Sequence, residues 1–313
     1  MSNRLNVLVT GGNGFLGSNL VPHLRGVNCE VSVIGRRTGH DLRDKGVLLR
    51  YLNNHRVDAV VHLAASVGGI GANRLQPAVF WHNNLQMGLN VLAECAELGI
   101  RKLLMMGSTC SYPKSPKTIP FVEEELFDGM PEGTNAPYGI AKRALIVGAQ
   151  AFRDEYKLNA VTLIPTNLYG PGDQFEGSWN HVIPAMIKRF HDAKREDAPS
   201  VTLWGSGAAT RDFLYVQDAC WAIGHALRGY DSPEPLNIGS GVETSIRDLA
   251  EMVRVIVGYN GAIEWDLLKP DGQPRRVLNC KKAKERLGWG ASTDLMLGLR
   301  KTYDWYCQVN ERV

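Results

Sequence analysis

The sequence predicts an α/β fold in which a doubly wound parallel sheet is joined to a smaller C-terminal α/β lobe. Two observations predict it. Short aliphatic runs alternate with amphipathic helical stretches through the first half of the chain, and after about residue 165 this alternation loosens into glycine- and proline-containing connections. Such alternation implies right-handed crossovers between parallel strands, with ligands bound at the carboxyl ends of the strands.

Five short, mostly aliphatic runs are the predicted buried strands, and helical stretches lie between them. Gly99 stands where a C-terminal cap glycine is expected. Two later strands are expected to return the chain to the first lobe. The predicted strands are 7–9, 30–34, 59–63, 102–106 and 160–164, the helices 18–25, 83–98 and 138–156, and the later strands 213–216 and 236–238. We therefore expect one domain over residues 1–165, with returns near 213–240, and a second lobe mainly over 166–313.

The composition is ordinary for a globular protein. Of 313 residues, 44% are hydrophobic and 21% charged, and 35 Lys+Arg against 32 Asp+Glu leave a net charge of +3. This balance gives no electrostatic argument for nucleic acid or an anionic membrane as a partner. No apolar run reaches the roughly 20 residues of a membrane helix. Six scattered cysteines without a C-x-x-C pair argue against a zinc site or a disulfide framework, so we expect no metal and a cytoplasmic location.

A glycine-rich loop follows the first predicted strand and opens the first helix. It contains the pattern Gly12-x-Gly14-x-x-Gly17. Between a strand and a helix, this pattern is typical of a Rossmann-type loop that holds a dinucleotide pyrophosphate at the helix N-terminus. A plain glycine-rich turn is the alternative, and the flanking elements disfavour it. The expected cofactor-binding residues here are Gly11, Gly12, Asn13, Gly14, Phe15, Leu16 and Gly17.

The end of the second predicted strand favours NADP over NAD. An NAD enzyme places an acidic residue there, whereas this chain reads Gly35-Arg36-Arg37. Two guanidiniums can bind a 2′-phosphate through charge-assisted hydrogen bonds. Two solvated arginines in a turn are the alternative. Further along, Asp41 and Leu42 are expected at the adenine, and Ala64 and Ala65 under the cofactor.

Ser108, Tyr138 and Lys142 form the predicted reaction centre. Ser108 follows the fourth strand, and the spacing of Tyr138 and Lys142 puts both on one helix face. A nearby ammonium lowers the pKa of a phenol, so Tyr138 could exchange a proton with a carbonyl or alcohol while Ser108 hydrogen-bonds the same oxygen. This arrangement suits hydride chemistry. A lone Tyr-x-x-x-Lys pair occurs by chance on many helices. The pair indicates a reaction centre here because it follows the glycine loop in the expected chain order.

With these motifs the chain resembles the extended short-chain dehydrogenase/reductase family nearly end to end. The likeness also rests on later segments that are more specific than the glycine loop. These are Val-Gly-Gly-Ile at 67–70, Gly-Ser-Thr-Cys-Ser-Tyr-Pro at 107–113, Pro-Thr-Asn-Leu-Tyr-Gly-Pro at 165–171, His-Val-Ile-Pro-Ala at 181–185, Trp-Gly-Ser-Gly at 204–207, Arg-Asp-Phe-Leu at 211–214 and Lys-Pro-Asp-Gly at 269–272.

Within the family, the resemblance is to GDP-sugar epimerase-reductases. It implies that GDP-4-keto-6-deoxy-D-mannose is epimerised at carbons 3 and 5 and then reduced at carbon 4 by NADPH, giving GDP-L-fucose. Cys110 matches the family's base and His181 its acid, and both residue types can titrate near neutral pH. Taken singly, a buried cysteine and a surface histidine are the plain alternatives. Ser108 and Tyr138 would polarise the same oxygen in both reactions.

The resemblance also implies two sets of binding residues. Arginine forks match diphosphate oxygens, and an indole can line a base pocket. The plain alternatives are that Trp204 is core and Arg189 a surface residue. Cofactor contacts are implied for Tyr138, Lys142, Asn167 and His181, and substrate contacts for Asn167, Lys188, Arg189, Trp204, Arg211 and Lys269.

The chain departs from the family at Asn13. A basic residue is frequent at this loop position, where it helps to bind the 2′-phosphate. Its absence leaves that task to Arg36 and Arg37 and weakens the preference for NADP.

Other functions of this fold are rival hypotheses. A sugar 4,6-dehydratase needs an acid after the fourth strand, but the chain reads Thr109-Cys110-Ser111, and a simple 4-epimerase would leave Cys110 and His181 without a role. An epimerase or reductase of another GDP-4-keto sugar is harder to exclude. A regulator that lost its chemistry predicts a broken Tyr138 and Lys142 pair, and a pure scaffold explains none of the site residues. The resemblance implies a homodimer formed through the helices at 83–98 and 138–156.

Overall fold

Six parallel strands form the central sheet of the computed structural model, which describes residues 4–177, 180–269 and 271–310. Their order is β10-β5-β4-β3-β1-β2, so β1 lies between β2 and β3. After β2 the chain crosses back over β1 to form β3 on its other side. The carboxyl ends of β1 and β3 are therefore the point where a doubly wound sheet binds its ligand. The strands are β1 (Leu5–Thr10), β2 (Cys29–Ile34), β3 (Ala59–His62), β4 (Lys102–Met106), β5 (Ala160–Pro165) and β10 (Leu236–Ile238).

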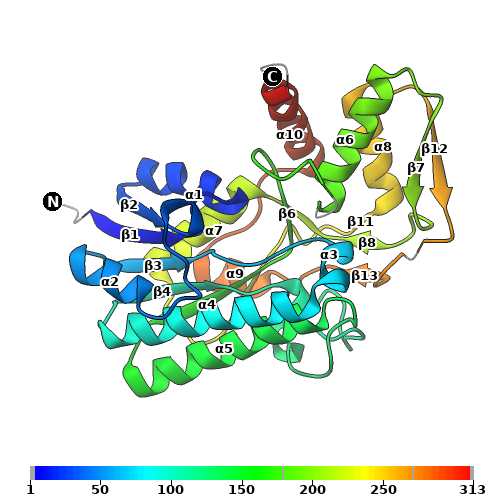
Figure 1. Ribbon diagram of the computed structural model, residues 1–313. Helices are drawn as coiled ribbons and strands as arrows, with labels where there is room; N and C mark the ends of the chain where they lie inside the picture. Colours follow the sequence, from blue (N-terminus) through cyan, green and yellow to red (C-terminus); the bar gives the residue numbers. More distant parts are fainter. Residues whose placement is uncertain (1–3, 178–179, 270, 311–313) are drawn as a thin grey trace.

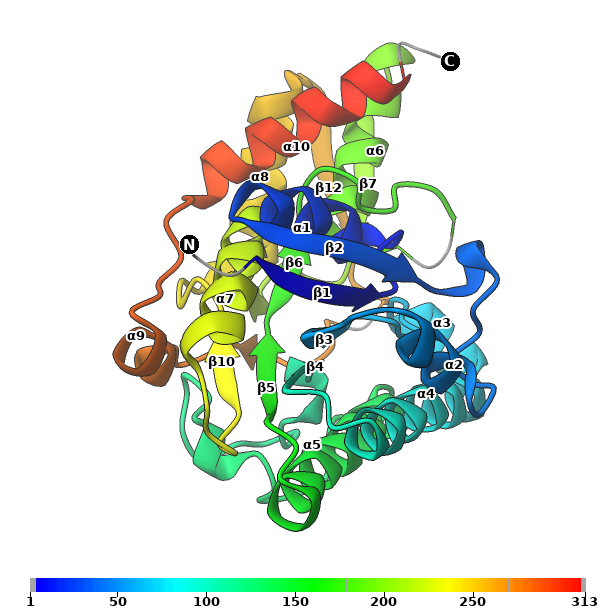
Figure 2. The same cartoon turned by 90° about the vertical axis from the view of Figure 1, so that its left-hand side faces the viewer.

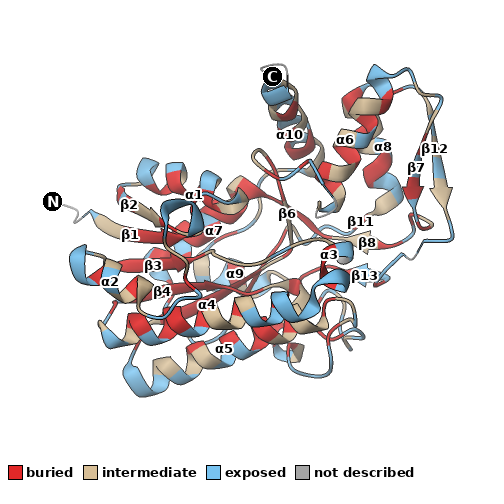
Figure 3. Cartoon of the chain, viewed as in Figure 1, coloured by how far each residue is buried: buried red, intermediate tan, exposed pale blue. Residues whose placement is uncertain are grey.

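Helices cover both faces of this sheet (Figures 1 and 2). Side chains alternate along β1, so Val7 and Val9 enter one core while Leu8 enters the other. The first face carries α1 (Phe15–Gly26), α7 (Val216–Gly229) and α9 (Lys281–Leu287), and the second carries α2 (Val47–Asn54), α4 (Pro77–Glu97) and α5 (Ala136–Tyr156). Figure 3 shows the sheet as a buried layer between the two sets of helices.

A second lobe stands beside the carboxyl ends of the sheet, at the upper right of Figure 1. It has its own core, which includes Phe190 and Tyr306. Its elements are α6 (Val182–Arg195), α8 (Ile246–Val257) and α10 (Leu295–Asn310), with the parallel pair β7 (Ser200–Trp204) and β12 (Ala262–Asp266). The boundary predicted at residue 165 stays a prediction.

Short elements connect the two lobes. The parallel pair β6 (Asn167–Tyr169) and β9 (Phe213–Tyr215) crosses from one to the other, beside a three-stranded sheet of order β11 (Thr244–Ser245), β8 (Thr210–Arg211) and β13 (Arg275–Arg276). The remaining elements are α3 (Ile70–Leu75) and the 3-10 helices η1 (Arg36–Thr38), η2 (Thr109–Ser111) and η3 (Glu123–Glu125).

The predicted strands and long helices are confirmed, with ends that differ by a few residues. Gly99 follows α4 with φ +63°, as a C-terminal cap requires. The expected return of the chain to the first lobe is confirmed at β10, which pairs with β5. By contrast, β9 pairs with β6 outside the central sheet. No helix of the described segments is long and apolar enough to cross a membrane.

Candidate active site

The glycine loop between β1 and α1 packs so tightly that side chains would not fit. A Cβ on Gly11, whose φ is +69°, would lie 2.8 Å from the backbone of Ala64 after β3, and one on Gly17 would lie 2.5 Å from the Cα of Gly12. Gly14 is the N-cap of α1 and has no side chain to cap the first turn. The N–H groups in the first turn of α1 therefore have no capping side chain, and such an uncapped helix N-terminus is the cradle that a pyrophosphate needs.

Arg36 and Arg37 lie in η1, directly after β2, and both are exposed. Arg37 Nη1 donates a hydrogen bond to the carbonyl oxygen of Asn13 at 3.2 Å, so its guanidinium lies over the glycine loop. A guanidinium at this place has the charge and reach to bind a 2′-phosphate. The Arg37 guanidinium thus contacts Asn13, the loop position at which the family often has a basic residue.

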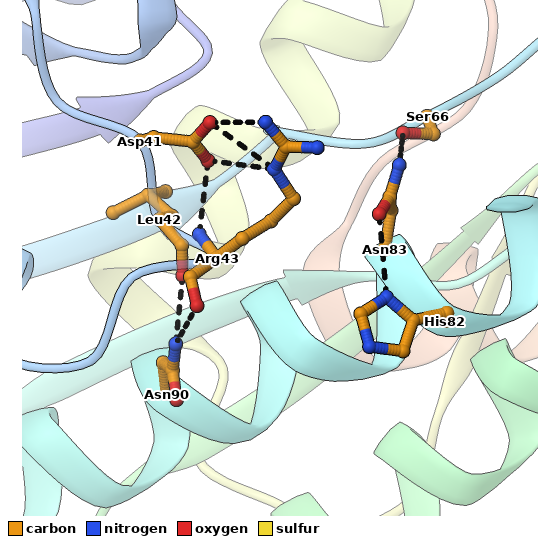
Figure 4. A network of polar contacts seen from close by, with 7 residues as sticks. All are labelled: Asp41, Leu42, Arg43, Ser66, His82, Asn83 and Asn90. Atoms are coloured by element: carbon orange, nitrogen blue, oxygen red, sulfur yellow. Dashed lines mark hydrogen bonds and ion pairs between the residues drawn. The ribbon is translucent and has the colours of Figure 1, made fainter.

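The segment after η1 is tied to α4 (Figure 4). Asn90 Nδ2 of α4 donates to the carbonyl oxygens of Leu42 at 2.9 Å and Arg43 at 3.1 Å. The Leu42 side chain is buried, and the Asp41 carboxylate pairs with Arg43, whose side-chain hydrogen bond holds the pKa of Asp41 below its usual value. Contact of Asp41 and Leu42 with an adenine stays a prediction.

The segment after β3 is tied to the same helix. Asn83 Nδ2 donates to Ser66 Oγ at 3.3 Å, and Asn84 Nδ2 donates to the carbonyl oxygen of Ser66 at 2.9 Å. Figure 4 shows Asn83 reaching from α4 to Ser66. Helix α4 therefore sets the position of the chain that carries Ala64 and Ala65.

His62, at the end of β3, joins the two strands that flank the predicted cofactor site. Its Nδ1 lies 2.8 Å from Thr10 Oγ1, which also accepts a hydrogen bond from the Ala64 N–H at 3.2 Å. Burial, with a smaller contribution from Lys142, lowers the pKa of His62 to about 3. The imidazole is therefore neutral at physiological pH and acts as a fixed link between β1 and β3.

The structure brings Ser108, Tyr138 and Lys142 together. Ser108 caps η2 after β4, and Tyr138 lies in the first turn of α5, where the hydroxyl of Ser108 acts to lower the pKa of its phenol. Lys142 is buried, with its Nζ 5.8 Å from the centroid of the Tyr138 ring. The Lys142 ammonium donates to the carbonyl oxygen of Met106 at 2.9 Å, which fixes it at the end of β4.

The expected effect of Lys142 on Tyr138 is not what the structure shows. Burial and then Cys110 raise the pKa of the Tyr138 phenol, and the Ser108 hydrogen bond only partly opposes them. The lysine lies over the ring and donates to Met106 rather than to the phenol oxygen, and burial lowers its own pKa to about 8. In this arrangement Tyr138 is a protonated acid at neutral pH.

Cys110 lies in η2 between this triad and the second lobe. Its carbonyl oxygen packs against Gly139, where a Cβ on α5 would overlap it, and its backbone N–H donates to Ser108 Oγ at 3.1 Å. On the other side, Arg276 Nη1 of β13 lies 3.8 Å from Cys110 Sγ. Cys110 as a residue is partly exposed.

His181 and Asn167 lie at the starts of two other elements, α6 and β6. His181 is the N-cap residue of α6 and is exposed, and desolvation by the protein around it lowers the pKa of its imidazole. Asn167 begins β6 and donates from Nδ2 to the carbonyl oxygen of Asp212 at 2.9 Å. Across the described segments, no hydrogen bond joins His181 to Cys110 or Tyr138, so its role as their partner stays a prediction.

The residues predicted to bind the substrate lie in the second lobe and in β8. Trp204 is 65% exposed at the end of β7, which excludes a core role, and Lys269 Nζ lies 5.5 Å from its ring centroid. Arg211 Nη1 donates to the carbonyl oxygens of Thr210 and Gln273, both at 2.7 Å, and burial lowers its pKa to about 10. Pro270, part of the segment behind the resemblance, lies outside the described residues.

Two further candidates already have protein partners. Arg189 Nη1 donates to the carbonyl oxygen of Thr202 at 2.6 Å. Lys188 makes ion pairs with Asp192 at 2.8 Å and Glu176 at 3.3 Å. Contact of either side chain with a substrate stays a prediction, and Lys188 would first have to leave its carboxylates.

Arg276 is a residue of this site that the sequence reasoning missed. No local spacing in the sequence links Arg276 to Cys110, which is 166 positions away. The structure buries Arg276 and exposes its neighbour Arg275. A two-residue strand has no periodicity from which this difference could be read.

Two cavities lie elsewhere, between α7 and α9. They measure about 290 and 210 Å³, share Trp221 and His225, and contain none of the predicted site residues. The residues of the predicted reaction centre lie instead between the end of β4 and the start of α5. In the parts of the chain that the structure describes, no group of three or more His, Cys, Asp or Glu side chains could hold a metal ion.

Comparison with known proteins gives consistent results. The model of the NAD dependent epimerase/dehydratase family matches residues 7–239. A GDP-L-fucose synthase of Sinorhizobium fredii is 42% identical over 298 residues, which cover 95% of this chain and 94% of the relative. A GDP-6-OMe-4-keto-L-xylo-heptose reductase from C. jejuni has a TM-score of 0.92 at 26% identity and 99% coverage of both chains. An NADP-bound GDP-L-fucose synthetase from Naegleria fowleri has a TM-score of 0.90 at 28% identity, covering 99% of this chain and 95% of its own.

Proposed function

Because the chain belongs to the NAD dependent epimerase/dehydratase family, we propose that it converts GDP-4-keto-6-deoxy-D-mannose into GDP-L-fucose, with NADPH as the hydride donor. The observation that carries this proposal is the cluster of Ser108, Cys110 and Tyr138 between the end of β4 and the start of α5. The cluster holds a hydroxyl pair for a carbonyl oxygen and a thiol beside it. A 4-reductase needs the first, and a 3,5-epimerase needs the second.

The residues of the first lobe fit the cofactor. Glycines 11, 12 and 17 let the loop pack closely against Ala64, Val33 and its own backbone, and the N-terminus of α1 follows directly after it. Arg37 over the loop, with Arg36 beside it, would hold the 2′-phosphate. When bound, NADPH supplies the hydride for carbon 4.

Epimerisation needs one base and one acid on opposite faces of the sugar ring, and we assign Cys110 and His181 to these roles. The thiolate of Cys110 takes the proton from carbon 3 or 5, the C–H electron pair moves into an enolate with its oxygen at carbon 4, and Cys110 becomes a thiol. The imidazolium form of His181, which a lowered pKa makes a stronger acid, returns a proton to the same carbon from the other face, and this rebuilds the ketone. Proton exchange with solvent restores both groups before the second carbon reacts.

Ser108 and Tyr138 serve both reactions at the same oxygen. During epimerisation their hydroxyls donate hydrogen bonds to the enolate oxygen and stabilise its charge. During reduction, the phenol of Tyr138 gives its proton to the oxygen as hydride reaches carbon 4. The raised pKa of Tyr138 suits this task, because the phenol is protonated before each turnover.

Replacing Cys110 by serine tests the assignment of the base. The Cys110→Ser variant should oxidise NADPH with the same substrate but release a 6-deoxy sugar that is not inverted at carbons 3 and 5. Product NMR reads this directly, and Cys307→Ser on α10 is the matched control, which should form GDP-L-fucose as before. Formation of GDP-L-fucose by Cys110→Ser at the unmodified rate would show that another group is the base.

A second candidate substrate is another GDP-4-keto sugar. The TM-score of 0.92 with a reductase of a GDP-4-keto-heptose favours it, since that protein shares the fold over 99% of both chains. Parallel assays with a 6-deoxy and a heptose GDP-4-keto sugar separate the two candidates. We expect the higher kcat/KM with the 6-deoxy sugar.

We also propose that the protein is a cytoplasmic homodimer. All six cysteines are free, as expected in a reducing compartment. The outer faces of α4 and α5 carry exposed apolar side chains, which suits contact with a second copy.

A further inference from the structure

Arg276 places a positive charge against the sulfur of Cys110. The Nη1 atom of Arg276 lies 3.8 Å from Cys110 Sγ, within hydrogen-bonding reach of sulfur, although the two residues are 166 positions apart in the chain. The side chain of Arg276 is buried at 9% exposure. A buried arginine needs an anionic or polar partner, because leaving its charge unpaired costs free energy.

The direction of the Arg276 guanidinium is held by its surroundings. Arg276 Nε donates to Gln273 Oε1 at 3.1 Å, and Gln273 Nε2 in turn donates to the carbonyl oxygen of Lys114 at 2.9 Å. The backbone carbonyl of Arg276 accepts from the Asp212 N–H at 3.0 Å, within a strand paired to Arg211. These contacts use Nε and the main chain, and Nη1 is left to contact Cys110 Sγ.

Among the described residues, no carboxylate forms an ion pair with this guanidinium. In the described parts of the chain, no Asp or Glu oxygen lies within 4.0 Å of an Arg276 nitrogen. Glu132, whose pKa Arg276 helps to lower, has its Oε2 engaged by the N–H and hydroxyl of Thr134 and by Asn135 Nδ2. Burial and, after it, the charge of Arg276 lower the pKa of Arg211, so the charge of Arg276 also acts on a second residue of the site.

We propose that Arg276 is a positioning residue that stabilises the thiolate of Cys110 and orients it toward the sugar ring. This inference rests on the proposed role of Cys110 as the base. A thiolate beside a guanidinium is favoured over the thiol, and proton removal from carbon requires the thiolate. When Cys110 takes a proton its negative charge moves to the enolate oxygen at carbon 4, and Arg276 favours the return of that proton to solvent, which regenerates the base.

The test follows the reactivity of Cys110 in the full-length protein without substrate. Iodoacetamide alkylation of the peptide that contains Cys110 is measured by mass spectrometry over a pH series. In Arg276→Gln we expect the rate at neutral pH to fall about tenfold and the rate curve to move to higher pH. Arg276→Lys keeps the charge and should restore the rate to within about twofold. Arg275→Gln, on the same strand but exposed and paired with Glu243, should not change it.

Two internal checks keep the result interpretable. Alkylation of Cys307 on α10 should be equal in all variants, which reports an intact fold. If Arg276→Gln does not fold, Gln273→Glu sets a carboxylate against Arg276 with little change in shape, and the same slowing of Cys110 alkylation is expected. Equal alkylation of Cys110 in the unmodified protein and in the folded variants would overturn the proposal.

A second readout separates this proposal from the proposed function. Incorporation of solvent deuterium at carbons 3 and 5 of the substrate, without NADPH, should lose kcat in Arg276→Gln while KM changes little. A raised KM with unchanged Cys110 alkylation would overturn the proposal and make Arg276 a substrate ligand. Absence of exchange in the unmodified protein would contradict the proposed function alone, because the alkylation experiment does not depend on it.

Discussion

The protonation state of Tyr138 follows from where its side chain lies. Burial and the neighbouring Cys110 raise the pKa of the phenol, so Tyr138 carries its proton at neutral pH and is able to donate it. Lys142, fixed on the carbonyl of Met106, acts as a cation over the ring rather than as a hydrogen-bond partner of the phenol oxygen. At the residue scale, the surroundings of Tyr138 therefore suit it to donate a proton to the oxygen at carbon 4 of the proposed substrate.

Removing this proton donor should damage reduction. In Tyr138→Phe we expect NADPH oxidation with the substrate to fall by about a hundredfold or more, because a positioned general acid contributes about 10²- to 10⁴-fold. The rate of NADPH absorbance loss measures it. Tyr156→Phe, exposed at the other end of α5, is the matched control and should keep the rate. A Tyr138→Phe enzyme as fast as the unmodified protein would remove Tyr138 from the mechanism.

His62 makes stability depend on pH. Its pKa of about 3 in the folded protein is below the ordinary value of 6.5, so between these values the unfolded chain binds the extra proton and stability falls as the pH falls. From pH 6.5 to pH 5 this costs about 2 kcal/mol. Urea unfolding at both pH values should show this loss in the unmodified protein and a smaller loss in His62→Gln. Equal losses would mean that His62 is not the titrating group.

At the element scale, η1 and the glycine loop act together through Arg37. The hydrogen bond from Arg37 to the carbonyl of Asn13 holds η1 against the loop that precedes α1. Asn90 and Asn83 of α4 fix the two following segments. A single helix, α4, thus fixes the positions of the two segments that follow β2 and β3 beside the predicted cofactor site.

Arg37→Ala tests which cofactor this edge selects. Loss of a charge-assisted hydrogen bond to a 2′-phosphate should raise KM for NADPH by about tenfold or more and leave KM for NADH nearly unchanged. Initial rates with each cofactor measure the effect. Arg56→Ala, exposed beyond α2, controls for lost charge. An equal rise of KM for both cofactors would show that Arg37 does not contact the phosphate.

The elements that could be predicted from sequence are those with a repeating signal. The aliphatic runs of β1 to β5 and the helices α4 and α5 carry clear periodicity, and the glycine loop has a defined context. The two-residue strands β8 and β13 carry none, although they hold Arg211 and Arg276 in the site. The contact between Arg276 and Cys110 depends on tertiary packing across both lobes, which no local pattern encodes.

At the scale of the whole molecule, α4 and α5 form an outer layer with apolar side chains on its surface. The two helices pack side by side where Gly88 of α4 meets Leu145 of α5, and the buried face covers the sheet. Figure 3 shows that the opposite face is largely exposed. Trp81, Leu89 and Val147 are among the large apolar side chains there, and such a patch is typical of an interface.

A charge within this layer should weaken the proposed dimer. We expect Leu89→Asp to raise the dimer dissociation constant by about tenfold or more, because it places an unpaired charge in an apolar contact. Light scattering after size-exclusion chromatography measures the mass over a dilution series. Val255→Asp, exposed on α8 in the other lobe, should remain dimeric. A monomer in the unmodified protein at all concentrations would contradict the dimer itself.

We propose that one site, which contains Ser108, Cys110 and Tyr138, performs both epimerisation and reduction. The unmodified protein can be incubated with GDP-4-keto-6-deoxy-D-mannose and NADPH in deuterium oxide, and the product can be analysed by NMR. We expect GDP-L-fucose that carries deuterium at carbons 3 and 5 and the cofactor's hydrogen at carbon 4. A reduced sugar without deuterium at carbons 3 and 5, or deuterium exchange without oxidation of NADPH, would contradict it.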